Sequence, residues 1–322
     1  MDRNTDLPVV QPTSPRRSSG AEAIADGPND GAALNRRLRK MYREKKLAQG
    51  ITVPDSPPPQ PPPLTRTTSN DPLVRNLLTA GGTVVYEKMH MWLIKHACGT
   101  RITKYRRDGP KPAEADAMRF VAQHTTIPVP EVYDAGPRHI TMAFVEGKTA
   151  QEGWDGLSEQ DRARAVAQLR DCVRQMRALK SPDGAVCGFG GHPRVDFRRY
   201  CGREGGPFAT EAEYNDWLVA DLFGTFEATA PMVRSQMRSD HDIVFSHGDL
   251  HDVNIMVRPG EGVVAVLDWE LAGWYPEYAD FFKPLRAPYP YRGYYEALFD
   301  IYPKHYEAEY PVDVVLSMCS RS

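Results

Sequence analysis

The part of the chain whose hydrophobic pattern predicts a folded domain begins with short runs rich in β-branched and aromatic residues. Such residues favour strands, whereas helices repeat their apolar positions every three to four residues. Four runs have the composition of strands: 83–86, 91–94, 101–105 and 140–145. Before the last run, apolar residues on one side of the segment 113–124 predict a helix, which prolines 128 and 130 end. The pattern predicts a small sheet with one helix, closed at Gly147.

After Gly147 the pattern becomes mainly helical. Ser158 fits the N-cap of a helix that ends before Pro182. The predicted apolar face of this helix consists of Val166, Leu169, Val173, Met176 and Leu179. A second long helix is predicted over 211–226, and the aliphatic run 263–267 predicts a buried strand.

Residues 1–70 have a different composition. Eleven of the 28 prolines lie there among serine and threonine clusters, with almost no aromatic residues. A segment of this kind buries too little apolar surface to offset its ordering entropy, so we expect a disordered tail with 57–63 extended as polyproline II. The basic segment 35–49 holds seven basic residues and one acidic residue. It is compatible with nuclear import through 36–46, an acidic partner, a membrane surface, or a solvated helix without a fixed partner.

Composition limits the classes of function. With 322 residues and 41% hydrophobic content, the chain can bury a sizeable core. The five scattered cysteines form no C-x-x-C pair, which argues against a disulfide framework or zinc site. We expect neither a secretory signal nor a transmembrane segment, and hence a cytoplasmic protein. Because residues 1–70 carry a net charge of +4 and the whole chain −2, the remainder carries −6. An acidic folded part argues against nucleic acid as a partner and favours a cationic ligand.

The segment 244–257, followed by 266–270, carries the candidate chemistry. Asp249 and Asn254 lie five residues apart between hydrophobic runs, and Asp268 ends an apolar strand. Magnesium prefers oxygen ligands and keeps several waters, so one carboxylate, one amide oxygen and nucleotide phosphates suffice to bind it. A remaining carboxylate can accept a hydroxyl proton, which is the positioning that phosphoryl transfer needs.

A phosphoryl-transfer site also needs a cation for the phosphates. Lys104 lies in the third predicted strand, and Glu114 follows at the start of the predicted helix. A strand lysine and a helix glutamate occupy these places in a kinase-like fold.

The sequence resembles the aminoglycoside phosphotransferase and choline-kinase-like family, most closely its fungal phosphotransferase-domain members. The resemblance covers about residues 80–310 and rests on these segments: His247-Gly-Asp-Leu-His-Asp-Val-Asn254, Leu267-Asp-Trp-Glu270, Gly273-Trp-Tyr-Pro276, Ile127-Pro-Val-Pro130, Phe144-Val-Glu-Gly147 and Gly206-Pro-Phe208. It implies an α+β, two-lobed protein kinase-like fold. The implied division is a tail over 1–70, a nucleotide-binding N-lobe over 71–147 and a helical C-lobe over 148–322.

The resemblance also implies roles for individual residues. Asp249 matches the catalytic aspartate, and His247 the histidine that supports its loop. Asn254 and Asp268 match the metal-binding pair. Lys104 matches the phosphate-binding lysine, and Glu114 matches its ion-pair partner. The hinge that reads adenine through its backbone corresponds to Met142, Ala143 and Phe144, and Asp280 matches a structural aspartate. The implied reaction transfers the γ-phosphoryl group of ATP or GTP, with Mg²⁺, to the hydroxyl of a small molecule.

Two features leave alternatives open. No G-x-G-x-x-G loop lies between the first two strands, where the sequence reads Glu87-Lys88-Met89-His90. This gap weakens the clamping of phosphates more than it weakens the assignment. A separate alternative to an active enzyme is a pseudokinase-like binding module whose tail recruits partners, although such a module has no physical need for the oxygens of Asp249, Asn254 and Asp268. The aromatic residues Trp269, Trp274, Tyr275 and Tyr278 could enclose a quaternary ammonium, but packing in the core is the simpler interpretation.

Overall fold

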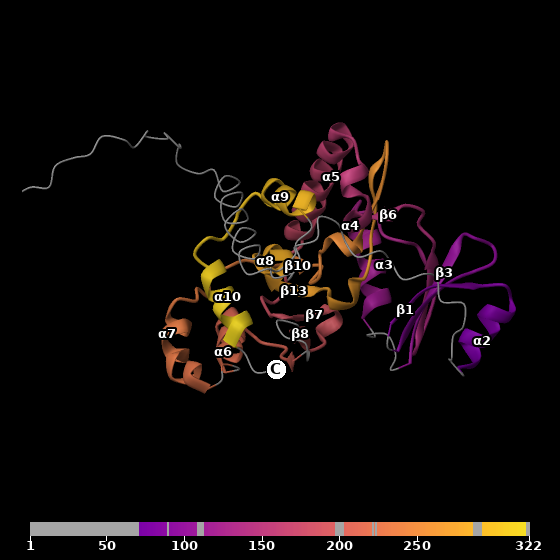
Figure 1. Ribbon diagram of the computed structural model, residues 1–322. Helices are drawn as coiled ribbons and strands as arrows, with labels where there is room; N and C mark the ends of the chain where they lie inside the picture. Colours follow the sequence, from indigo (N-terminus) through magenta and orange to yellow (C-terminus); the bar gives the residue numbers. More distant parts are fainter. Residues whose placement is uncertain are drawn as a thin grey trace, which may run out of the picture. The chain divides into compact units, whose positions relative to one another are not determined.

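The computed structural model describes residues 71–88, 90–107, 113–196, 203–220, 222, 224–285 and 292–319. Figure 1 follows this part of the chain from the indigo helix α2 to the yellow helix α10. The predicted disordered tail 1–70, with its polyproline stretch and basic segment, lies outside the described residues. Within the described ranges, no helix combines the length and the apolar character needed to cross a membrane.

The first part of the described chain is a five-stranded sheet in the order β1-β2-β3-β5-β4, with every neighbouring pair antiparallel. Its strands and helices are α2 (Pro72–Thr79), β1 (Thr83–Lys88), β2 (Met91–Lys95), β3 (Arg101–Arg106), α3 (Glu114–His124), β4 (Val132–Gly136) and β5 (His139–Ala143). Lys104 lies opposite Leu93 of β2 and Ile140 of β5. The central strand of the sheet therefore carries the predicted phosphate-binding lysine.

Helix α2 covers one face of this sheet. Its Val74 packs in a cluster with Trp92 and Tyr105, and the Asp71 side chain caps it by accepting the Leu73 N–H. Because side chains alternate along a strand, Tyr105 and Lys104 point to opposite faces. The sequence predicted only one helix with the sheet, namely α3; the structure adds α2, which begins with the N-cap aspartate and first-turn proline typical of a helix start.

The chain after β5 is mainly helical, with three small sheets in the orders β10-β13-β7, β12-β11-β6 and β8-β9. Its strands are β6 (Lys148–Thr149), β7 (Cys187–Gly188), β8 (Arg194–Asp196), β9 (Arg203–Gly205), β10 (Ile243–Ser246), β11 (Ile255–Arg258), β12 (Gly262–Val266) and β13 (Gly273–Pro276). Its α-helices are α4 (Ala150–Gly153), α5 (Glu159–Ala178), α6 (Glu211–Val219), α7 (Ala230–Ser235), α8 (Ala279–Leu285), α9 (Arg292–Ile301) and α10 (Tyr310–Cys319). The 3-10 turns are η1 (Trp154–Gly156), η2 (Phe189–Gly191), η3 (Gly224–Thr229), η4 (Asp252–Asn254) and η5 (Trp269–Leu271).

Helix α5 agrees with its sequence pattern, whereas the helix predicted over 211–226 is too long. The Ser158 side chain caps α5 by accepting the Asp161 N–H, and Leu169, Val173 and Met176 are buried on the predicted face. Helix α6 ends at Val219 because the Leu222 N–H donates to the Val219 carbonyl in a tighter turn. Glycine at 224 adds a further cost of about 1 kcal/mol for a continued helix.

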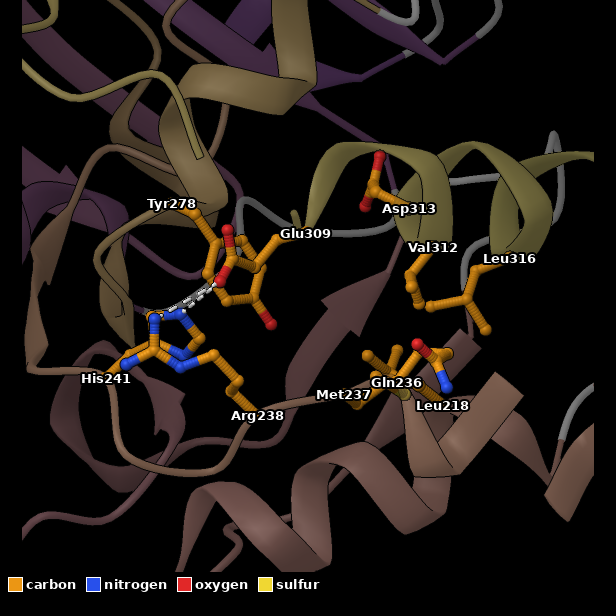
Figure 2. Close-up of a pocket in the computed structure, with 10 residues that line it drawn as sticks. All are labelled: Leu218, Gln236, Met237, Arg238, His241, Tyr278, Glu309, Val312, Asp313 and Leu316. Atoms are coloured by element: carbon orange, nitrogen blue, oxygen red, sulfur yellow. Dashed lines mark hydrogen bonds and ion pairs between the residues drawn. The ribbon is translucent and has the colours of Figure 1, made fainter. Parts of the chain in front are cut away.

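A buried histidine connects α6 with the residue that precedes α10. His241 Nδ1 lies 2.7 Å from Glu211 Oε1, and Nε2 lies 3.1 Å from Glu309 Oε1. Figure 2 shows His241 and Glu309 directed toward one another, with Arg238 Nη1 3.7 Å from the same glutamate oxygen. Burial lowers the pKa of His241, but the two carboxylates outweigh it and raise that pKa above its ordinary value. An imidazolium with both nitrogens donating fits this arrangement.

The free energy of unfolding should therefore depend on pH through His241. Its folded-state pKa is raised, so this stabilisation is complete below the unfolded value of about 6.5 and is lost as pH rises through the folded value. We expect His241→Gln to cost about 2 kcal/mol at pH 6 and progressively less at higher pH. Urea unfolding from pH 6 upward measures this, with the exposed His124→Gln as control. A cost that stays constant with pH would contradict the prediction.

Candidate functional site

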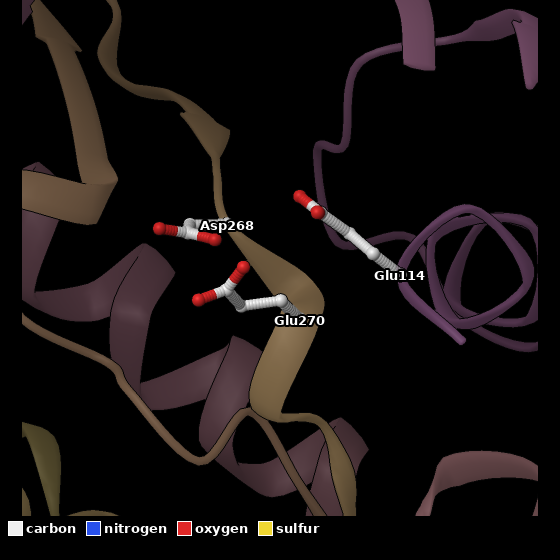
Figure 3. Close-up of side chains that lie close together, drawn as sticks. All are labelled: Glu114, Asp268 and Glu270. Carbon is white, nitrogen blue, oxygen red and sulfur yellow. The ribbon is translucent and has the colours of Figure 1, made fainter. Parts of the chain in front are cut away.

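Three carboxylates surround the ammonium group of Lys104. Its Nζ lies 2.9 Å from both carboxylate oxygens of Glu114, 2.8 Å from Asp268 Oδ1 and 3.6 Å from Glu270 Oε2. Figure 3 shows Glu114, the first residue of α3, with its carboxylate directed toward Asp268 and Glu270. The structure thus brings together Lys104, Glu114 and Asp268, which were predicted from separate segments of the sequence.

Local backbone geometry explains how these side chains meet. Helix α3 begins at Glu114 and packs against η5, the turn that follows Asp268. Asp268 itself has a φ of 63°, in the left-handed region that residues other than glycine, asparagine, aspartate and histidine rarely adopt. Strained backbone of this kind is retained where the surroundings determine it, and it collects at functional sites. The turn at Asp268 redirects the chain from β12 toward Lys104.

The charges in this cluster shift one another's pKa values. Burial raises the pKa of Glu114, although the Lys104 ammonium opposes it. Burial would also raise the pKa of Asp268, but Lys104 outweighs it and holds that pKa below its ordinary value. Lys104 shows the reverse balance, because burial favours its neutral form while Glu114, Asp268 and Glu270 raise its pKa. The three carboxylates therefore favour the charged form of Lys104 at this site.

The predicted catalytic loop follows β10. His247 is fully buried; its Nδ1 accepts the Asp249 N–H at 3.1 Å, so Nε2 carries the proton and donates to the Leu267 carbonyl at 2.8 Å. Asn254 Nδ2 donates to the Asp249 carbonyl oxygen at 2.9 Å and to Asp249 Oδ2 at 3.2 Å. The pairing of β11 with β12 brings Asn254 beside Leu267, the residue before Asp268. The loop and the lysine cluster are thus parts of one site.

The oxygen donors of this site fit a hard divalent cation. One ligand oxygen from each of Glu114, Asp268 and Glu270 lies within 4.8 Å of the others. Because the Asn254 amide nitrogen donates to Asp249, its oxygen is the atom that can coordinate a metal ion. Carboxylate and amide oxygens without cysteine or histidine are the ligand set that magnesium prefers.

Asp280 has a larger role than the sequence suggested. Its carboxylate accepts the backbone N–H of His247 at 2.8 Å and that of Gly248 at 2.7 Å. A carboxylate that accepts two backbone N–H groups fixes the conformation of the loop that donates them. Asp280 therefore holds the chain immediately before Asp249.

Sequence reasoning missed three further residues around the site. Arg106 pairs with Glu270, and both flank the Lys104 cluster. Lys283 Nζ lies 3.4 Å from Asp249 Oδ1. Arg106 could have been found from the alternation of β3, since it lies two residues beyond Lys104, and Glu270 from its place two residues after Asp268. His251 Nε2 lies 3.6 Å from the same Asp249 oxygen.

The predicted hinge lies at the end of β5 and just beyond it. Met142 is buried in the core, whereas Ala143 and Phe144 are partly exposed. The Ala143 N–H donates to the Glu131 carbonyl and the Phe144 N–H to the Thr100 carbonyl, both at 2.9 Å. Neither N–H is therefore available to a nucleotide base.

The aromatic residues near the site pack in the core, as the simpler interpretation held. Trp269, Tyr275 and Tyr278 are buried, and Trp269 packs against His247 and Phe245. The pocket in Figure 2 contains none of the predicted site residues and has a volume of about 20 Å³, room for roughly one water molecule. We therefore do not assign a substrate to that pocket.

The backbone geometry of the predicted catalytic loop requires glycine at position 248. Its φ is 79°, and a Cβ at this position would overlap the Leu271 carbonyl oxygen. We expect Gly248→Ala to destabilise the fold by more than about 2 kcal/mol, from backbone strain and steric overlap together. Gly184→Ala is the matched control, because Gly184 has a φ of 75° with no atom within 4 Å of the added Cβ. Urea unfolding should show a loss of only about 1 kcal/mol for the control; equal losses would exclude the steric explanation.

Comparisons with known proteins bear on the fold and on the family. Among solved structures, the streptomycin–ATP ternary complex of APH(2'')-IIa is 11% identical, with a TM-score of 0.55 over 80% of this chain and 93% of that chain. ADP-bound APH(2'')-Ib is 11% identical, with a TM-score of 0.54 over 76% and 90%. The GDP complex of aminoglycoside 2'-phosphotransferase-IIIa is 12% identical, with a TM-score of 0.52 over 77% and 88%. At these identities the likeness shows the kinase-like fold.

The family comparison is more specific than the fold. A search of curated proteins finds no match. The model of the phosphotransferase enzyme family, APH, matches residues 92–311, a range that includes Lys104, Glu114, Asp249, Asn254 and Asp268. This match confirms the family that the sequence resembles, while the narrower likeness to fungal members stays a prediction. The chain belongs to the phosphotransferase enzyme family.

Proposed function

We propose that this phosphotransferase moves the γ-phosphoryl group of ATP or GTP to the hydroxyl of a small molecule, with Mg²⁺ as cofactor. The observation that carries the proposal is the convergence of Lys104, Glu114 and Asp268 beside the loop that presents Asp249 and Asn254. Phosphoryl transfer needs mainly positioning and charge neutralisation, and these groups supply both. Solved structures with the same fold contain ATP, ADP or GDP, which supports a nucleotide as donor.

Each residue has a task in this reaction. Lys104, oriented by Glu114, binds the nucleotide phosphates, and Asp249 accepts the proton of the attacking hydroxyl. The hydroxyl oxygen forms a bond to the γ-phosphorus while the bond to the β–γ bridging oxygen breaks, and the nucleoside diphosphate leaves with that electron pair. His247 and Asp280 keep the Asp249 loop in place through their hydrogen bonds.

Asn254 and Asp268 would hold the magnesium ion, which neutralises charge on the phosphates. Asp268 is bound to Lys104 in the described structure, so nucleotide binding has to redistribute this ion pair. The base would be read by backbone carbonyls of 142–144 or by the Val145 N–H, since the N–H groups of Ala143 and Phe144 are already bonded.

The acceptor is proposed only by class. A streptomycin and a gentamicin complex are among the solved structures with this fold, which supports a cationic amino sugar as the acceptor. The net negative charge of the folded part supports the same choice, and choline, a sugar and a protein side chain are the alternatives with a free hydroxyl. A screen that follows ADP release separates these acceptors directly.

The first test is the free energy of unfolding with and without Mg²⁺ and ATP. A ligand at 100 times its dissociation constant should stabilise the native state by about 2.7 kcal/mol. We expect this gain with both components present and a much smaller gain with ATP in EDTA. The absence of any gain for folded protein would favour the pseudokinase-like binding module, and GTP in place of ATP shows which nucleotide is preferred.

A further inference from the structure

Lys283 of α8 faces the predicted catalytic carboxylate, and the family resemblance assigns no role to this lysine. Its ammonium nitrogen lies 3.4 Å from Asp249 Oδ1, and the two side chains are 17% and 26% exposed. The other carboxylate oxygen, Oδ2, accepts from Asn254. The two oxygens of Asp249 therefore have different partners, one on the predicted metal side and one on Lys283.

The position of Lys283 follows from a single turn of α8. Asp280 and Lys283 are three residues apart, so they lie on the same face of this helix. Asp280 is buried and bonds the backbone of His247 and Gly248, which fixes that face against the catalytic loop. The contact of Asp280 with the loop therefore also places Lys283 beside Asp249, so the position of Lys283 does not depend on its own side chain alone.

The distance also matters. A charge-assisted N–H···O bond is about 2.8 Å long, so at 3.4 Å the ammonium attracts the carboxylate without forming a short direct bond. His251 Nε2, at 3.6 Å, approaches the same oxygen from the loop itself. Electrostatic attraction between partly buried charges is stronger than in water, so Lys283 restricts the orientation of the Asp249 carboxylate.

We propose that Lys283 is a positioning residue of the phosphotransferase, a proposal that rests on the function proposed above. It holds Asp249 through Oδ1, so that the carboxylate keeps one orientation while it takes the proton of the attacking oxygen. Its positive charge also offsets the negative charge that builds up where the oxygen attacks. A neutral side chain of the same length can do neither.

Water can serve as the acceptor when the natural one is unidentified. Its oxygen then forms the bond to the γ-phosphorus, ADP leaves with the electron pair of the broken bond, and Asp249 takes the proton. The measured products are ADP and inorganic phosphate, and the same assay accepts any hydroxyl compound that the acceptor screen yields.

Lys283→Met removes the charge and keeps the length of the side chain. We expect kcat for ADP release to fall about 100-fold, while the Kd for Mg²⁺·ADP measured by calorimetry changes less than threefold. Lys180→Met is the control, because Lys180 is an exposed lysine paired with Asp242 at 2.8 Å, and it should leave both values unchanged.

Chemical rescue separates the charge from a merely structural effect. Lys283→Cys should show the same fall in kcat for ADP release. Alkylation of this cysteine with 2-bromoethylamine, which rebuilds a lysine-like ammonium, should raise its kcat at least about tenfold. Wild-type protein treated in the same way gives the background from the other cysteines.

Three results would overturn the proposal. The first is a folded Lys283→Met protein that keeps wild-type kcat, the second a parallel loss of kcat and Mg²⁺·ADP affinity, and the third a failure of alkylation to restore turnover. If wild-type protein neither binds Mg²⁺·ADP nor releases ADP from ATP, the proposed function itself fails, and the role of Lys283 fails with it. Normal wild-type binding and turnover with an unaffected Lys283→Met protein contradicts only the role of Lys283.

Discussion

Asp249→Ala should lower kcat for phosphoryl transfer by at least about 100-fold, because it removes the carboxylate that we propose takes the proton of the attacking hydroxyl. The affinity for Mg²⁺·ADP should change little, since Lys104, Asn254 and Asp268 remain. ADP release measures the first quantity and calorimetry the second. The expected pattern is thus a fall in kcat without a matching fall in nucleotide binding.

The control for this variant is Asp242→Ala, which removes an exposed carboxylate paired with Lys180. Exposed pairs contribute about 0–1 kcal/mol to stability, so the control should keep both turnover and stability. Asp249→Ala also leaves Lys283 without this partner, which makes a thermal unfolding measurement necessary beside the kinetics. Wild-type turnover by folded Asp249→Ala protein would remove this residue from the mechanism.

Asp268→Asn should abolish the Mg²⁺-dependent part of nucleotide binding. Asparagine tolerates the left-handed φ of 63° found here, so the substitution removes the charge without adding backbone strain. We expect the stabilisation of about 2.7 kcal/mol by saturating Mg²⁺ and ATP to fall below about 1 kcal/mol. Unfolding in urea, with and without the ligands, measures it.

Wild-type protein with ATP in EDTA provides the comparison for this variant. If Asp268 acts through the metal ion, the variant with Mg²⁺ should resemble wild type without Mg²⁺. An undiminished Mg²⁺-dependent stabilisation in Asp268→Asn would assign the metal to other oxygens, with Glu114 and Glu270 as the nearest candidates.

Local patterns predicted most of the fold. The strand composition of β1, β2, β3 and β5 and the capped amphipathic pattern of α5 depend on nearby residues, and the structure confirms them. The predicted end of α6 was wrong by several residues. Leu222 packs in the same core cluster as Leu218 of α6, but through a tight turn that the sequence pattern does not distinguish from a helix. Helix α2 had readable start signals in Asp71 and Pro72, but it directly follows the proline-rich region.

Residues of the candidate site could be predicted where the secondary structure of their own segment indicates their role. Lys104 lies in a strand, Glu114 at a helix start and Asp268 after a strand, and the structure places all three together. The contacts of Asp280 with the loop and of Lys283 with Asp249 depend on how α8 packs, and no local pattern specifies that packing. Residues that act through tertiary contacts of this kind are visible only in three dimensions.

The hydrogen bonds from Asp280 to His247 and Gly248 also bear on the order in which the protein is made. A ribosome synthesises the chain from its N-terminus, so Asp249, Asn254 and Asp268 are all present before Asp280 appears. Until then, two backbone amides of the catalytic loop lack their acceptor. A nascent or truncated chain that stops before Asp280 would carry every recognisable motif and yet lack the means to shape the loop. Competence for turnover would therefore be one of the last properties that the growing chain acquires.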